Sequence, residues 1–441
     1  MTQDTTINPT PIQPSLLKQA IIAAAIALVG FGLHKGIEWH ETNTLPIPVT
    51  SVGQNRLNAE DIQLARTAWR YFQKNRLSTG LVSSAADFPS TTMWDVGSQL
   101  AGMVAARELG LLKPAEFDQW IEEVLATLAK IPLYRNELPN KAYNAKTLIP
   151  VNYGKLAEPE EIGFSAIDLA RLVQWLDIIE TRYPKHAAAS KAVTARWQLK
   201  RLLKNGQLMG TAIKNGKETW NQEGRLGYGQ YAAYRLQKIG IVAPKTLDTK
   251  TETEFINVMG VELPADKRTT YHNYVTSEPY ILDGLESGFQ ALPAEYAAKL
   301  LQAQQRRYQA TNQLTAWSED NLDRQPWFVY NCIFVNGQPW KSIDSSGKDA
   351  TVYRGSSVKA AISWNMLFQT RYTERLYKGM RWLADPTRGV FAGFYEETQE
   401  PNRALTVNTN GIVLEAILYR RVGKPLTVWA DVKNSSVYAF V

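Results

Sequence analysis

Three loops of the sequence place a carboxylate directly ahead of a segment that is rich in small residues. "STTMWDVGSQL" carries Asp95 beside Trp94, "NQEGRLGYGQY" carries Glu223, and "TSEPYILDGLESG" carries Glu278. Cleavage of a glycosidic bond needs two carboxyl groups, because one protonates the leaving oxygen while the other, ionised, activates water or attacks the sugar. We therefore predict Asp95 and Glu278 as the first catalytic pair, with Glu223 as the substitute.

Aromatic and amide side chains accompany these acids. The chain has 13 Trp and 20 Tyr residues, and their flat rings suit the faces of pyranose sugars. The segment "LTVNTNGIV" adds two asparagines at the entry to another helix. The predicted substrate-binding residues are Trp94, Tyr228, Tyr280, Trp340, Asn408 and Asn410.

Each candidate also has a purely structural interpretation. A carboxylate at a helix start, such as Asp95, gains from the free N–H groups and the dipole of the first turn. The apolar surroundings of Asp168 favour an ion pair with an arginine, for which Arg171 is a candidate. Asp283 and Glu286 are three residues apart on one helix face, which favours solvated or salt-bridged roles. Single Trp and Tyr residues more often belong to the core than to a sugar platform.

Other chemistries find no support in the sequence. It has no P-loop, no GxGxxG after a strand, no HExxH and no GxSxG. The only cysteine, Cys332, excludes an intrachain disulfide and four-cysteine zinc sites, and its apolar neighbours favour an inert buried thiol. With only four histidines, we expect no metal site and no cofactor. The formal charge of +7 is scattered, which favours no nucleic-acid partner but would mildly attract acidic polymers or lipid surfaces.

Helices are the elements that must position these residues. "NAEDIQLARTAWRYFQKN" begins with Asn58 as N-cap, has acids in its first turn and carries an apolar stripe. Since no stretch shows a run of regular long strands, we predict an all-α fold. Further helices are expected at about 92–109, 115–131, 165–182, 187–204, 224–239, 276–288, 294–312, 356–371, 373–384 and 409–421.

A diverged pattern recurs along the chain: a Gly with a short extended piece, a polar loop, and a helix rich in small residues. Helices with many Gly and Ala residues can approach their neighbours closely, which suits an inner ring. Amphipathic helices such as 116–130 and 296–308 suit an outer ring. Alternating inner and outer helices predict an (α/α)6-type toroid, a closed relative of the helical solenoid. The loops before the inner helices then share one face, rimmed by short β-hairpins.

The N-terminal region has the clearest targeting signal. Residues 20–33, AIIAAAIALVGFGL, carry no charge. Adding Leu16 and Leu17 extends the stretch to 18 positions, enough to cross a membrane if the Lys18 side chain reaches back to the membrane surface. The poor match to a small-x-small cleavage site favours an uncleaved anchor over a cleaved signal peptide. We predict that the main domain is exported to the periplasm or the extracellular space, or alternatively secreted after signal cleavage. The predicted segments are a cytoplasmic or disordered N-terminus at 1–15, an anchor at 16–35, a linker at 36–57, the toroid at 58–425 and a tail at 426–441.

Several motifs in order give the chain a family resemblance. "TTMWDVGSQLAGMVAARELGLL", "FSAIDLARLVQWL", "GYGQYAAYRL", "TSEPYILDGLESG" and "LTVNTNGIVLEAILYR" resemble the bacterial domain-of-unknown-function family 3131 over about residues 58–422. The resemblance implies an α/α toroid similar to glycoside hydrolases, including the β-1,2-glucanase-like families, and an association with the bacterial envelope or exopolysaccharide. Relatives of this fold usually invert configuration, which requires carboxyls about 6.5–9.5 Å apart. Ala170 departs from the family pattern, where a Gly is expected. The matching motif positions are Trp94, Asp95, Asp168, Glu223, Glu278, Asn408 and Asn410.

These observations together predict an exported, carbohydrate-active protein of the glycoside hydrolase type that acts on a bacterial polysaccharide or glucan by carboxylate acid/base catalysis. The expected partners are a polysaccharide or oligosaccharide, and a membrane through the N-terminal helix. One alternative is a non-catalytic glycan-binding or scaffolding subunit of an envelope or exopolysaccharide system. Another is a protein-binding helical repeat, which would present a broad apolar groove instead of a polar site.

Overall fold

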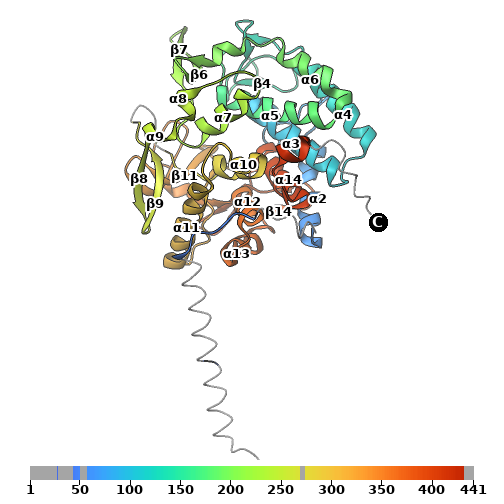
Figure 1. The fold of residues 1–441 in the computed structure, drawn as a ribbon. Helices are drawn as coiled ribbons and strands as arrows, with labels where there is room; N and C mark the ends of the chain where they lie inside the picture. The colour runs from blue at the N-terminus through green and yellow to red at the C-terminus, as the bar shows by residue number, and fades with distance from the viewer. Residues whose placement is uncertain (1–26, 28–42, 50–56, 269–273, 432–441) are drawn as a thin grey trace, which may run out of the picture. The chain divides into compact units, whose positions relative to one another are not determined.

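The computed structural model describes Ala27 and residues 43–49, 57–268 and 274–431 of the chain. One compact unit spans Pro46–Val441, and its helices and sheets are drawn in Figure 1. The other unit, Met1–Leu45, lies almost entirely outside the described residues.

Six helices of the described chain form a closed ring, in which each helix packs against the next and the last packs against the first. All residues of two of them are buried, as expected for helices that are surrounded on every side. The ring therefore forms the middle of the compact unit (Figure 1). These inner helices are α3 (Met93–Glu108), α5 (Ala166–Arg182), α7 (Tyr228–Gln237), α10 (Glu278–Ser287), α12 (Val358–Phe368) and α14 (Val407–Val422).

A second set of helices covers the ring from outside. The first outer helix in the chain, which begins at Ala59, has the predicted N-cap Asn58. Asn58 and Asp61 form a reciprocal capping box. Most of these helices bury one face against an inner helix, so the predicted alternation of inner and outer helices is present. The outer helices are α2 (Ala59–Asn75), α4 (Pro114–Leu128), α6 (Ala187–Thr194), α8 (Pro244–Leu247), α9 (Thr249–Glu252), α11 (Ala294–Thr311), α13 (Arg371–Met380) and α15 (Leu426–Asp431).

Short antiparallel sheets occupy the connections between the helices, seven of them in the described residues. Four are two-stranded and three are three-stranded. The pairs are β1 (Ser90–Thr92) with β4 (Ala142–Asn144), β2 (Leu133–Tyr134) with β3 (Leu138–Pro139), β8 (Thr253–Val258) with β9 (Val261–Asp266), and β14 (Ala384–Asp385) with β15 (Gly389–Val390). The triplets are β5 (Leu203–Lys204), β6 (Gln207–Lys214) and β7 (Lys217–Gln222); β10 (Glu319–Asn321), β11 (Phe328–Val335) and β12 (Gln338–Ile343); and β13 (Gly355–Ser357), β16 (Gly393–Tyr395) and β17 (Pro401–Asn402).

The prediction of an all-α fold is wrong, because these sheets are a substantial part of the structure. The β6–β7 hairpin alone has six cross-strand residue pairs. A helix was expected over 187–204, but α6 ends at Thr194 and the chain continues into a 3-10 turn and β5. The fold is therefore a helical toroid with a sizeable β component.

The predicted N-terminal hydrophobic helix at 16–35 receives no support. Apart from Ala27 it lies outside the described residues. Among the helices that the structure describes, none is long and apolar enough to cross a membrane.

Close approach between inner helices gives a test of the packing. A Cβ added to Gly411 of α14 would lie 2.6 Å from the carbonyl oxygen of Ser98 in α3, where the backbone cannot move aside. We expect Gly411→Ala to lower the free energy of unfolding by about 1–3 kcal/mol, despite the better helix propensity of Ala. Gly154→Ala is the control, since nothing lies within 4 Å of its Cβ. Urea denaturation measures both, and equal stabilities would refute the close packing.

Candidate active site

The first turns of all six inner helices meet at one end of the ring. Each contributes a polar or aromatic side chain, and hydrogen bonds, ring contacts or charge interactions connect these side chains. The geometry arises because a toroid directs the starts of its inner helices to the same face. The first-turn residues are Trp94 and Asp95 in α3, Asp168 in α5, Tyr228 in α7, Glu278 in α10, Lys359 in α12 and Asn408 in α14.

The amide of Asn408 joins three inner helices. Its Oδ1 accepts hydrogen bonds from Trp94 Nε1 at 3.1 Å and from Ser98 Oγ at 2.9 Å. Its Nδ2 donates to Glu278 Oε1 at 3.3 Å. These contacts use both ends of the amide and fix its orientation, so the Trp94 indole and the Glu278 carboxylate are held in place together.

Glu278 shares a buried lysine with a second acid. The side chain of Glu278 is only 2% exposed, and its Oε2 lies 2.7 Å from Lys359 Nζ. The same Nζ lies 3.3 Å from Asp320 Oδ1. Burial raises the pKa of both acids, that of Asp320 to about 7, and the positive charge of Lys359 opposes the rise. Burial also works against the charge of Lys359, but the two acids hold its pKa above the usual value.

Asp95 forms a capping box with Thr92 at the start of α3. Its Oδ2 accepts from Thr92 N at 3.1 Å and from Thr92 Oγ1 at 2.8 Å. The structural interpretation of Asp95 as a helix cap is therefore confirmed. The side chain also remains partly exposed. Burial, helped by the negative charge of Glu278, raises its pKa to about 6, although the Thr92 bonds and Arg171 favour the ionised form.

Asp168 occupies the same helix position in α5 and is also partly exposed. Burial raises its pKa to about 7, and the negative charges of Glu223 and Asp95 add to the rise. The predicted ion pair with Arg171 is absent, because Arg171 binds Glu286 and Glu415 instead. Asp95 and Asp168 thus form a pair of like charges at the starts of adjacent helices.

Glu223 caps the same helix from a neighbouring loop. Its Oε2 accepts hydrogen bonds from the backbone N–H groups of Ala166 and Ile167, the latter at 3.2 Å. Burial raises its pKa, while these bonds favour the ionised form. This carboxylate therefore has a structural function, and its negative charge contributes to the raised pKa of Asp168.

Two tyrosines complete the surroundings of the acids. The Tyr228 hydroxyl donates to Glu319, and the Tyr228 ring meets Trp94 edge-on with centroids 5.6 Å apart. Tyr153, in the loop between β4 and α5, has a side chain that is 53% exposed. The pKa of its hydroxyl is nevertheless raised well above the usual value, by loss of contact with water and by the negative charge of Asp168 and other acids. Tyr153 thus lies near the carboxylates, and part of its surface is in contact with solvent.

Three predicted substrate-binding residues have other contacts. Tyr280 is 1% exposed and belongs to the core. Asn410 is fully buried, and its amide binds the backbone N–H and carbonyl of Val390. Trp340 packs edge-on against Trp317 at 5.5 Å. The structure therefore groups Trp94, Tyr228 and Asn408 with the acids and gives these three packing or backbone contacts instead.

Sequence reasoning missed four residues of this site: Lys359, Glu319, Asp320 and Tyr153. One of them had a detectable signal. Lys359 is the only charge in "VKAAISWNMLF", a helix otherwise made of small, apolar and amide residues. The adjacent acids Glu319 and Asp320 lie in a β-strand. No helix was predicted over this segment, so these two acids had no predicted place in the site.

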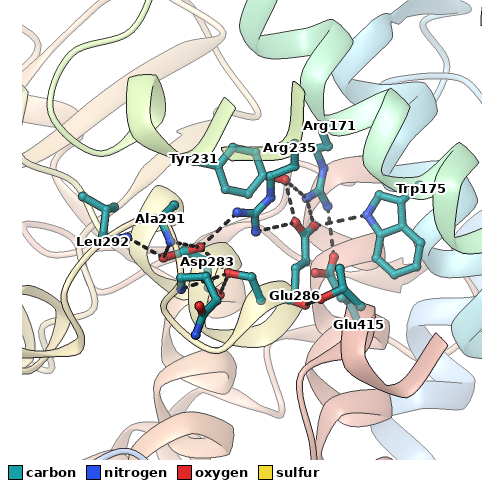
Figure 2. Close-up of polar contacts among 12 residues, drawn as sticks. Arg171, Trp175, Tyr231, Arg235, Asp283, Glu286, Ala291, Leu292 and Glu415 are labelled. Carbon is teal, nitrogen blue, oxygen red and sulfur yellow. Dashed lines mark hydrogen bonds and ion pairs between the residues drawn. The ribbon is translucent and has the colours of Figure 1, made fainter. Parts of the chain in front are cut away.

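A buried charge network lies behind the site, between the inner helices (Figure 2). Arg171 binds Glu286 at 2.7 Å and Glu415 at 3.0 Å, and the side chains of all three are completely buried. Arg235 binds Asp283 at 3.0 Å and Glu286 at 3.2 Å. The expectation of salt-bridged roles for Asp283 and Glu286 is confirmed.

The network also contacts the site directly. Arg171 Nε donates to Ser98 Oγ at 3.2 Å, and Ser98 in turn donates to Asn408. The guanidinium carbon of Arg171 lies 5.0 Å from the centre of the Trp94 ring. Arg171 therefore supports the orientation of both Trp94 and Asn408.

A family model matches most of this chain. The model described as "Protein of unknown function (DUF3131)" covers residues 63–423. The chain belongs to this family. No curated protein matches the chain.

Several solved structures have a fold similar to that of this DUF3131 member. A glucoamylase-like protein from Bacteroides caccae aligns with a TM-score of 0.61 and 12% identity, over 84% of this chain and 94% of that one. An endo-β-1,2-glucanase from Chitinophaga pinensis, in complex with sophorotriose and glucose, aligns at 0.60 and 11% identity, over 85% and 95%. An endo-β-1,2-glucanase from Talaromyces funiculosus with sophorose aligns at 0.56 and 11% identity, over 84% and 85%. At these identities the likeness shows a shared toroid fold.

Proposed function

We propose that this protein is a glycoside hydrolase, in which Asp168 protonates the leaving oxygen and Asp95 activates water. The observation that carries the proposal is the pair of partly exposed carboxyls at the same position of adjacent inner helices, with pKa values raised to about 7 and about 6. Two interacting carboxyls with separated pKa values supply one protonated and one ionised group near neutral pH.

The environments of the two acids favour this division of roles. Asp95 accepts two hydrogen bonds from Thr92, which stabilise its ionised form and suit a base. Asp168 lies beside the negative charge of Glu223, which favours its protonated form and suits an acid. Asp95 remains from the pair predicted from the sequence, and Asp168 takes the place of Glu278 in the proposal.

Glu278 fits a positioning role better than a catalytic one. Its carboxylate is buried and bound by Lys359 and Asn408, so a substrate has little access to it. Through Asn408 it fixes the Trp94 indole, which lies at a steep angle to the Tyr228 ring. The rings of Trp94 and Tyr153 are the aromatic surfaces that we propose for binding sugar faces.

We propose a β-glucan of bacterial origin as the substrate class, with β-1,2-glucan as the first to test. Two proteins of the same fold are endo-β-1,2-glucanases, in complex with sophorotriose or sophorose. The open position of Tyr153 beside the acids supports binding of an extended chain from this side.

The test is to incubate the purified full chain with β-1,2-, β-1,3-, β-1,4- and β-1,6-glucans and to measure new reducing ends. We expect release from at least one glucan, and none with Asp95→Asn. Binding of a glucan without any release by the unmodified protein would contradict hydrolysis and favour the non-catalytic glycan-binding alternative.

The rate should depend on pH in a bell shape with its maximum between pH of about 6 and about 7. A base works ionised, so the rate falls as pH drops through the pKa of Asp95, about 6. An acid works protonated, so the rate falls as pH rises through the pKa of Asp168, about 7. The measurement is kcat/KM across this range, with the fold checked by circular dichroism at each pH. A flat profile would contradict the assignment.

A further inference from the structure

Arg225 lies on a rigid loop between β7 and α7, two residues after Glu223. The backbone N–H of the next residue, Leu226, donates to Asp266 Oδ2 at 2.7 Å. The carbonyl of Arg225 accepts from Gly229 N at 2.9 Å. Because both contacts hold the peptide bond that follows Arg225, the backbone at this residue has a defined place beside the candidate active site.

The guanidinium group rests on an aromatic platform. Its carbon lies 3.7 Å from the centre of the Tyr274 ring, 5.4 Å from that of Tyr330 and 5.5 Å from that of Tyr228. Tyr274 and Tyr330 stack on each other with centroids 4.4 Å apart. Stacking on a ring face leaves the N–H groups at the edge of the guanidinium plane free to bind a planar acceptor.

No carboxylate of the described chain neutralises Arg225, although acids are close. The side chain of Arg225 makes neither an ion pair nor a hydrogen bond with any residue that the structure describes. Asp266 is engaged by Arg268 and by the backbone of Leu226. Glu319, which pairs with Tyr330 across two strands, accepts from Tyr228. A half-buried guanidinium that the neighbouring acids leave unpaired is available for an anion from outside the chain.

The platform adjoins the proposed catalytic acids. Tyr228 contacts Trp94, and the negative charge of Asp168 contributes to the raised pKa of Tyr330, after burial as the main cause. Tyr330 in turn contributes to the raised pKa of Tyr153, for which burial is the main cause. A sugar bound on Tyr330 would therefore be near the sugar whose bond is cut.

We infer that Arg225, Tyr274 and Tyr330 form a subsite for a negatively charged sugar, whose anionic oxygens bind the guanidinium. Such oxygens belong to the carboxylate of a hexuronic acid or to a phosphate or sulfate ester, and the flat fork of Arg can bind two oxygens of such a group at once. The inference rests on the proposed glycan-binding function and predicts that the protein binds a glycan with anionic groups more tightly than a neutral one. The formal charge of +7 favours the approach of such a polymer.

The test measures binding to the full chain by calorimetry, with three probes of equal length: a neutral β-1,2-gluco-oligosaccharide, an oligogalacturonate and a sulfated gluco-oligosaccharide. We expect Arg225→Gln to raise the Kd for at least one anionic probe by about tenfold or more, and the Kd for the neutral probe by less than about twofold. The anionic probe whose affinity falls more in Arg225→Gln identifies the kind of anion that the subsite prefers.

Two further variants isolate the contribution of the guanidinium. Arg66→Gln removes the same charge from an exposed arginine of α2, and should change every Kd by less than about twofold. Arg225→Lys keeps the charge but loses the planar fork, so it should recover only part of the anionic affinity. Melting temperatures confirm that all variants fold.

The outcomes separate this inference from the proposed function. Equal losses for neutral and anionic probes in Arg225→Gln would mean that Arg225 only supports the tyrosines, and would overturn the inference. Equal effects of Arg225→Gln and Arg66→Gln on the anionic probes would also overturn it. Attraction between the positive charge of the whole protein and the probe would then explain the binding. If the unmodified protein binds the neutral probe alone, the subsite is refuted and the proposed function stands. If it binds none of the probes, glycan binding itself is contradicted.

Discussion

Asp168→Asn is expected to lower kcat for glycan hydrolysis by at least about 100-fold, with little change in KM. The amide keeps the size of the carboxyl group but cannot give a proton to the leaving oxygen. Asp95→Asn should cause a loss of similar size, because an amide cannot accept a proton from the attacking water. Initial rates at saturating glucan measure both, and a variant that keeps more than a third of the activity would remove its residue from the catalytic pair.

A control on the same helix makes the result specific. Asp177 also lies in α5 and also has a pKa raised by burial, but it is near the other end of the helix. Asp177→Asn should keep nearly full activity, since it changes the same charge away from the first-turn residues. A large loss in this control would attribute the effect to disturbance of α5 instead of to acid catalysis.

Stability should move in the opposite direction to activity for Asp168→Asn. The pKa of Asp168 in the folded chain, about 7, is above the ordinary value for Asp. Its contribution to stability is therefore fully present below the unfolded pKa and is lost as pH rises through the folded pKa. Asn stays neutral like the protonated acid, so the variant should be at least as stable as the parent protein at neutral pH. A marked drop in melting temperature would mean that inactivity reflects unfolding.

The helices of the ring were predictable because their signals are local. Asn58 and Asp61 predict the start of α2 through a capping box. The Gly and Ala residues around Gly411 predict close packing between inner helices. The strands were missed although the sequence has turn signals for them. Asn-Gly pairs at 205–206, 215–216 and 336–337 each have positive φ at both residues, which fits the tight turns of β-hairpins. These dipeptides are the local signal for hairpins in a chain whose other local signals predict helices.

The site was partly predictable for a similar reason. Asp95 and Glu278 could be placed on a common face because both begin helices of the same type. Their partners depend on side chains far away in the chain: Lys359 binds Glu278 across 81 positions, and Arg171 binds Glu286 across 115. No local pattern encodes such pairs, so the sequence left open that Glu278 is buried and that Asp168 is not paired with Arg171.

Arg171→Met is expected to lower the free energy of unfolding by about 3–5 kcal/mol, the largest loss of stability that we predict for this chain. The substitution keeps a long side chain but leaves Glu286 and Glu415 without one of their cations (Figure 2). Urea denaturation measures the loss. Arg388→Met is the control, because Arg388 pairs with Asp87 on the surface at 3.3 Å and should cost less than about 1 kcal/mol.

A second substitution in the same network distinguishes lost charge from lost packing. Two arginines face three acids, so the network is neutral only if one acid keeps its proton. Burial and the charge of Glu286 raise the pKa of Glu415 well above its usual value, which makes Glu415 that acid. Glu415→Gln should therefore cost less than about 1 kcal/mol, since Gln resembles protonated Glu in shape and charge. If Glu415→Gln destabilises as much as Arg171→Met, Glu415 is ionised and the ring contains an uncompensated negative charge.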